Sequence, residues 1–105
     1  MSNLTFGQAI EAAKEGKLIS RAGWNGKGMY VFQRPADEIL ISAVVKIKSL
    51  PEAVKETFRN KTFDEGVTVK FTAYLCMKAA DGSIVNGWLA SQTDMLANDW
   101  GIIEY

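Results

Sequence analysis

The sequence predicts a small α+β domain, in which an antiparallel β-sheet carries two or three short helices packed on it. Three observations predict this class. Helix-start signals occur at Thr5, Ser49 and Ser91, each before a short candidate helix. Runs rich in β-branched and aromatic residues lie between these signals. Two tight-turn pairs, Asn25-Gly26 and Asp81-Gly82, join neighbouring runs as hairpin turns do.

Composition limits the range of functions. The 105 residues suffice for one domain, 1–105, and a hydrophobic share of 48% with a charged share of 23% is typical of a soluble globular protein. No apolar run approaches the length of a membrane-spanning helix, so we expect no membrane partner. The single cysteine, Cys76, excludes an intrachain disulfide and fits a reducing cytoplasm.

Charge and residue types argue against nucleic-acid binding and against catalysis. Twelve basic and twelve acidic residues cancel, whereas proteins that bind DNA or RNA generally carry a basic excess. The chain has no histidine, the commonest general base and metal ligand, and one cysteine alone cannot form a zinc site. Carboxylate pairs such as Asp94 with Asp99 occur in most proteins. We therefore expect a protein that is not an enzyme and holds no metal or cofactor.

The first third of the chain predicts a helix and two strands. Thr5 and Gln8 have the spacing of a capping box, and apolar residues follow at helical spacing. A short strand is expected at 18–21. A second is expected at 29–33, because Pro35 would interrupt a ladder of backbone hydrogen bonds.

The remaining elements rest on the same signals. The β-branched residues of 39–47 predict an extended segment, and the pair Ser49 and Glu52 predicts a capped helix that reaches residue 59. Further strands are expected at 84–89 and 100–105. The longest strand candidate is 67–78, whose core-facing parity consists of Val67, Val69, Phe71, Ala73 and Leu75.

The stretch around the last helix signal has two interpretations. Ser91 is a favourable N-cap, and Asp94 stands three residues later, where a carboxylate can bond back to the cap. In the first interpretation, this is a capped helix whose flanking tryptophans fill the core. In the second, Trp88 and the helix start bind a ligand, with Gln92 and Thr93 as further polar groups. Residue chemistry alone favours the first, because tryptophan is mostly buried.

A glycine-rich stretch at 22–28 is the second candidate site. Asn25-Gly26 predicts a hairpin turn, yet Trp24 in such a turn has little to pack against unless a ligand or another chain covers it. The stretch lacks the Gly-Lys-Ser/Thr ending of a phosphate-binding loop. Trp24 and Trp88 could together clamp a flat base. Four basic residues could meet phosphates: Arg21, Lys27, Arg34 and Lys78.

Four stretches of the sequence resemble the Thoeris anti-defence two-like family, whose members are small proteins of phages and prophages. These are LTFGQA at 4–9, RAGWNGKGM at 21–29, MKAADGSIV at 77–85 and WLASQTDMLANDW at 88–100. The resemblance covers about 4–34 and 74–105. Within the single domain of 1–105, the segment of about 35–66 is divergent or inserted.

The resemblance implies a molecular sponge that binds and sequesters a cyclic nucleotide immune signal, either a cyclic ADP-ribose isomer or a cyclic dinucleotide. It implies homo-oligomers with pockets where protomers meet, and tryptophans that stack on adenine. By motif position, Trp24 and Trp88 are those rings. The matching polar pocket candidates are Asn25, Ser91, Gln92, Thr93 and Asp94.

We hypothesise that the chain forms a homo-oligomer, specifically a tetramer, which sequesters such a nucleotide in the cytoplasm of the host bacterium. Arg21 or Lys27 would neutralise a phosphate. The alternative from another class is a phage-encoded interaction module that binds a host protein through the Trp24 turn. A phosphodiesterase acting on the same nucleotides is disfavoured, because the chain has no histidine.

Overall fold

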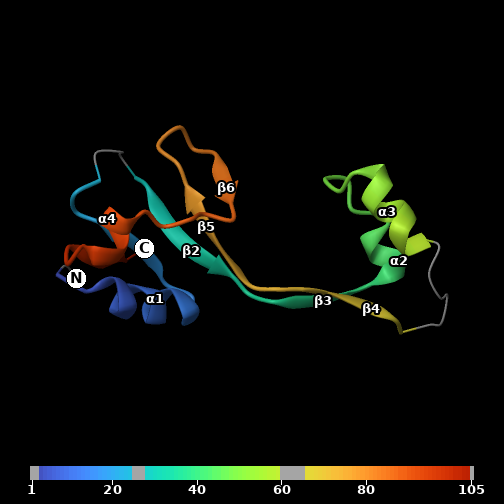
Figure 1. The fold of residues 1–105 in the computed structure, drawn as a ribbon, viewed down its shortest axis with the longest axis horizontal. Helices are drawn as coiled ribbons and strands as arrows, with labels where there is room; N and C mark the ends of the chain where they lie inside the picture. The colour runs from blue at the N-terminus through green and yellow to red at the C-terminus, as the bar shows by residue number, and fades with distance from the viewer. Residues whose placement is uncertain (1–2, 25–27, 60–65, 105) are drawn as a thin grey trace. The chain divides into compact units, whose positions relative to one another are not determined.

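The computed structural model describes residues 3–24, 28–59 and 66–104. They divide into two compact units, one within 1–35 and 73–105 and the other within 36–72. The described elements, in chain order (Figure 1), are α1 (Phe6–Lys14), β1 (Leu18–Arg21), β2 (Tyr30–Arg34), β3 (Asp37–Leu40), α2 (Ile41–Val44), α3 (Glu52–Arg59), β4 (Thr68–Phe71), β5 (Tyr74–Lys78), β6 (Ile84–Asn86), α4 (Gln92–Leu96) and β7 (Trp100–Ile103).

The first unit is built on a five-stranded antiparallel sheet. Its strand order is β6-β5-β2-β1-β7, so the first and last strands of the chain are neighbours. Ile19 lies opposite Val31 on one side and Ile102 on the other, and Arg21 lies opposite Trp100. Because side chains alternate along a strand, Arg21 and Trp100 project from the same face of the sheet as Ile19. This register carries Arg21 to the edge of the core.

Helix α1 covers that face of the sheet. Thr5 Oγ1 accepts a hydrogen bond from the Gln8 backbone N–H at 3.2 Å, and the Thr5 N–H donates to Gln8 Oε1 at 2.9 Å, which confirms the predicted capping box. One stripe of the helix faces the strands and completes the core. The buried residues of this core are Ala9, Ala12, Ala13, Ile19, Val31 and Trp100.

The second unit pairs β3 with β4 in an antiparallel ribbon that carries α2 and α3. Val44 of α2 is fully buried, and Lys55 of α3 is buried with its Nζ 3.6 Å from Glu52 Oε1. The segment of about 35–66, predicted to be divergent or inserted, falls almost wholly within this unit.

The prediction of an extended conformation at 39–47 is wrong beyond Leu40, where β3 ends. The chain turns there into α2, in which the Val45 N–H donates to the Ile41 carbonyl at 3.2 Å. β-branched residues fit a sheet surface, but their preference is a weak bias that packing overrides. Burial of Val44 against the ribbon supplies that packing.

Three further predicted boundaries are wrong. Residues 67–78 form two strands in different sheets, interrupted at 72–73, and Ala73 is exposed. The strand expected at 84–89 ends at Asn86, because Gly87 has a φ of 72°, a left-handed conformation that turns the chain. The helix expected from Ser49 begins only at Glu52, after Pro51.

The α+β class is confirmed, with an antiparallel sheet and short helices packed on it. The described residues contain four helices, because α2 adds one to the three predicted. Among the described residues, none of the helices has the length and apolar character that crossing a membrane requires.

Candidate functional site

The three tryptophans of the chain form one cluster in the first unit. Trp100 is fully buried, whereas Trp24 and Trp88 are partly buried and pack against the core. The ring centroid of Trp100 lies 5.3 Å from that of Trp24 and 6.3 Å from that of Trp88. Both contacts are edge-to-face, the favourable arrangement for aromatic pairs. The folded chain therefore brings together the two tryptophan motifs that the sequence singled out.

The contact between Trp24 and Trp88 determines what these rings can hold within one chain. Their centroids are 6.2 Å apart and their planes are inclined by 76°. A base held between two rings needs parallel planes separated by two stacking distances. The interpretation of two indoles facing each other across a base does not fit this geometry within one chain.

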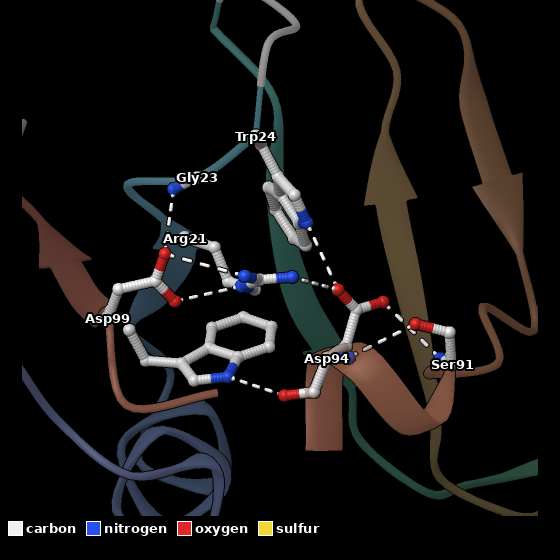
Figure 2. Close-up of polar contacts among 7 residues, drawn as sticks. Arg21, Gly23, Trp24, Ser91, Asp94 and Asp99 are labelled. Carbon is white, nitrogen blue, oxygen red and sulfur yellow. Dashed lines mark hydrogen bonds and ion pairs between the residues drawn. The ribbon is translucent and has the colours of Figure 1, made fainter. Parts of the chain in front are cut away.

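Arg21 connects the cluster to two carboxylates (Figure 2). Its Nε lies 2.8 Å from Asp99 Oδ1, and its NH1 lies 2.8 Å from Asp94 Oδ1. The Gly23 backbone N–H donates to Asp99 Oδ2 at 2.8 Å. The side chains of Arg21 and Asp94 are 15% and 14% exposed, so these charge-assisted bonds are shielded from water. The end of β1 is thereby fixed to α4 and to the start of β7.

Asp94 is the centre of this network (Figure 2). Its Oδ1 also accepts from the Trp24 indole Nε1–H at 3.2 Å, while its backbone carbonyl accepts from the Trp100 Nε1–H at 2.9 Å. Asp94 Oδ2 accepts from the Ser91 N–H, and Ser91 Oγ accepts from the Asp94 N–H, which confirms the predicted capping box of α4. One residue therefore caps a helix and contacts two indoles.

The electrostatics agree with this geometry. Burial raises the pKa of Asp94, but hydrogen bonds from Arg21, Trp24 and Ser91 outweigh it, so its pKa lies below the ordinary value. The hydrogen bond from Arg21 is the main reason why the pKa of Asp99 is also lowered. Hydrogen bonds to Asp99 and Asp94 raise the pKa of Arg21. All three groups are charged at neutral pH.

The other predicted site residues lie around this centre or away from it. Gln92 and Thr93 are exposed in the first turn of α4, which has only five residues. Lys78 Nζ lies 5.6 Å from the centre of the Tyr30 ring, on strands β5 and β2. Asn25 and Lys27 lie outside the described residues.

Sequence reasoning noted Asp99 only as one of several unspecific carboxylates. Its role depends on Arg21, which is 78 residues away in the chain, and the neighbourhood of Asp99 in the sequence carries no signal for that pairing. Among the described residues, no group of three His, Cys, Asp or Glu side chains is arranged to hold a metal ion.

Comparison with known proteins decides the family. The model of the Thoeris anti-defense 2-like domain matches residues 4–103. The chain belongs to the Thoeris anti-defense 2-like family. A relative, Thoeris anti-defense 2 of Bacillus phage SP01, is 33% identical over 103 residues, which cover 97% of each chain. The resemblance predicted from the sequence motifs is confirmed, and membership of the Thoeris anti-defense 2-like family supports a role against anti-phage defence.

Gly23 offers a test of the carboxylate network in this Thoeris anti-defense 2-like chain. A Cβ at position 23 would lie 2.9 Å from Asp99 Oδ2 and 3.1 Å from Arg21 NH2. Both atoms are held by hydrogen bonds, so we expect Gly23→Ala to lower the free energy of unfolding by about 1 kcal/mol. Urea unfolding would measure this.

Gly7→Ala is the matched control for Gly23→Ala. Gly7 lies in α1, and the nearest atom to an added Cβ is 3.9 Å away, so alanine there should be neutral or stabilise by up to about 0.5–1 kcal/mol. Equal effects of the two substitutions would contradict a tight fit at Gly23.

Proposed function

We propose that the protein binds a cyclic nucleotide immune signal, a cyclic ADP-ribose isomer or a cyclic dinucleotide, and sequesters it without turning it over. It would thereby counter anti-phage defence in the cytoplasm of the host bacterium. The observation that carries this proposal is the position of Trp24 and Trp88. Both tryptophans belong to the same aromatic cluster as Trp100. Trp100 is fully buried, whereas Trp24 and Trp88 remain partly exposed. An exposed indole face is a stacking surface for adenine.

We propose that each partly exposed ring stacks on one side of a base, so the ligand needs a second surface for its other side. We propose that a second protomer supplies this surface, within a tetramer whose pockets are shared. Support comes from large apolar side chains beside Trp88 in the sequence: Leu89 is 89% exposed and Leu96 is 79% exposed. Contiguous exposed apolar surface commonly marks an interface, and we propose that these two side chains contribute to one.

We propose that exposed polar side chains near Trp88 in the sequence make the polar contacts to the ligand. Gln92 and Thr93 are exposed near Trp88 in the sequence and can donate and accept hydrogen bonds. Ser91 is less suited, because both its hydroxyl and its N–H are used in the capping box. The helix dipole contributes little, since α4 is only five residues long.

Isothermal titration calorimetry against cyclic ADP-ribose isomers and cyclic dinucleotides tests the proposal. We expect one tight ligand, with fewer than one ligand bound per chain if pockets are shared. Trp88→Ala should weaken its binding by at least about tenfold, because stacking contributes roughly 1–3 kcal/mol per base. The absence of binding across the panel would contradict the proposal.

Tyr30→Ala is the matched control for Trp88→Ala. Tyr30 is also partly exposed, but it adjoins Val31 on β2 and therefore projects from the opposite face of the sheet. The Tyr30→Ala variant should therefore bind the ligand with an affinity within about twofold of the wild-type value. A second experiment separates a sponge from an enzyme, since a heat-denatured complex should release the nucleotide intact.

The second candidate function is a module that binds a host protein. The exposed Leu89 and Leu96 favour it, because the same apolar side chains could contact a different protein instead of a second copy. This alternative predicts no uptake of any cyclic nucleotide in the panel, with a monomer in sedimentation experiments.

A further inference from the structure

The residues around Trp24 hold both its backbone and its ring. The Ala22 N–H donates to the Asp99 carbonyl at 3.0 Å, and the Gly23 N–H donates to Asp99 Oδ2, so Asp99 fixes the two residues before Trp24. The Trp24 N–H donates to the Arg21 carbonyl at 3.2 Å. The indole Nε1–H is held by Asp94 Oδ1 (Figure 2). The orientation of the ring is therefore set from both ends.

The polar side chains of this network form hydrogen bonds with one another. Arg21 directs Nε and NH2 toward Asp99 and NH1 toward Asp94. Asp94 Oδ1 accepts from two donors and its Oδ2 from a third, the Ser91 N–H. Three of the five N–H donors of Arg21 are thereby used within the chain, so only the two remaining ones could reach a ligand without displacing these contacts.

The charge balance of the network points the same way. One guanidinium is surrounded by two carboxylates, so the group carries one net negative charge. A phosphate brought to Arg21 would meet this net negative charge at short range, which is unfavourable. Arg21 is therefore poorly placed to neutralise a ligand phosphate.

We propose that Arg21, Asp94 and Asp99 are positioning residues, which fix the orientation of the partly exposed Trp24 indole. They act on a ligand through that ring and do not contact the ligand themselves. The orientation of Trp24 is a property of the free protein, while its consequence for affinity rests on the proposed function.

Indole N–H signals in a ¹H–¹⁵N NMR spectrum of the full chain test the positioning without any ligand. The chain has three tryptophans, and loss of one signal in Trp24→Phe assigns Trp24. In Asp94→Asn and in Arg21→Lys, both of which retain polar side chains, the Trp24 signal should shift more than that of Trp100. The Trp100 signal should respond less, because its N–H bonds the backbone carbonyl of Asp94, which both substitutions retain.

Asp81→Asn is the matched control. Asp81 bonds only within its own turn, to Ser83, so neither indole signal should move. If the Trp24 signal stays in place in both Asp94→Asn and Arg21→Lys, the positioning role is overturned. This result is independent of whether any nucleotide binds.

A double-mutant cycle tests the effect on affinity, with the tightest ligand of the cyclic nucleotide panel as the probe. Asp94→Asn alone should weaken binding about tenfold, but less than about twofold in the Trp24→Phe background, which has no indole N–H to hold. Additive losses would mean that Asp94 contacts the ligand directly and would overturn the proposal. If the panel yields no ligand, the proposed function fails, and the NMR result still decides the positioning.

Discussion

Trp100→Ala is expected to lower the free energy of unfolding by about 3–5 kcal/mol, which is a large part of the stability of a domain of this size. The Trp100 side chain is 0% exposed and contacts the rings of Phe6, Trp24 and Trp88. Alanine would leave a cavity at the meeting point of α1, β1 and β7. It would also remove the shorter of the two hydrogen bonds to the Asp94 carbonyl, the other being from the Ala97 N–H at 3.4 Å.

Urea unfolding followed by far-ultraviolet circular dichroism would measure this loss, because the substitution itself alters the fluorescence. Ile84→Ala is the control: Ile84 on β6 is also a large apolar residue, but it is 49% exposed and has no part in the proposed interface, so we expect a loss of less than about 1 kcal/mol. A loss below about 1 kcal/mol for Trp100→Ala would show that the tryptophan cluster does not form the core.

Local signals predicted the helix starts that depend on side chains three residues apart. Thr5 with Gln8 and Ser91 with Asp94 both form complete capping boxes. Both partners of such a motif lie within one helical turn, so the motif can be predicted from the sequence alone. The Ser49 signal failed, since the helix begins only at Glu52, after Pro51. The residue before a proline is disfavoured in the α conformation, so Leu50 is a poor first helical residue.

Elements that depend on distant contacts were beyond sequence reasoning. Residues 39–47 have the composition of a strand, but α2 forms there, with Val44 fully buried and with contacts from α2 to β3, β4 and α3. Similarly, 67–78 reads as one continuous strand, but its halves pair with different partners, β3 and β2. Periodicity reports which residues share a face, and it does not report which strand is the neighbour.

The candidate site shows the same division. Motifs indicated Trp24 and Trp88. The core-filling interpretation of the last helix describes Trp100, whereas Trp88 is only partly buried and its binding of a ligand stays a prediction. The partners of Arg21 lie 73 and 78 residues away, so no local pattern could pair it with Asp94 and Asp99. Asp99, which the sequence marked only as one member of an unspecific carboxylate pair, is a structural link in the folded chain.

Arg21→Ala is expected to lower the free energy of unfolding at pH 7 by about 1–3 kcal/mol, a range that allows for the partial exposure of the three charges. The loss should depend on pH. The pKa values of Asp94 and Asp99 are lowered in the folded chain, so the stability they contribute is present above about pH 4, their ordinary pKa. It is lost as the pH falls through the lowered folded values.

Without Arg21, the pKa values of both carboxyls should move up toward the unfolded value, and the variant should lose less stability on acidification. Urea midpoints between pH 7 and pH 3 should therefore converge for the two proteins, because the wild-type chain alone loses the contribution of the network. Lys14→Ala is the control: its pair with Glu11 is exposed, with side chains 58% and 71% accessible, and should contribute less than about 0.5 kcal/mol. A constant difference between Arg21→Ala and wild type across this range would mean that Arg21 stabilises the fold through its packing and not through these two carboxylates.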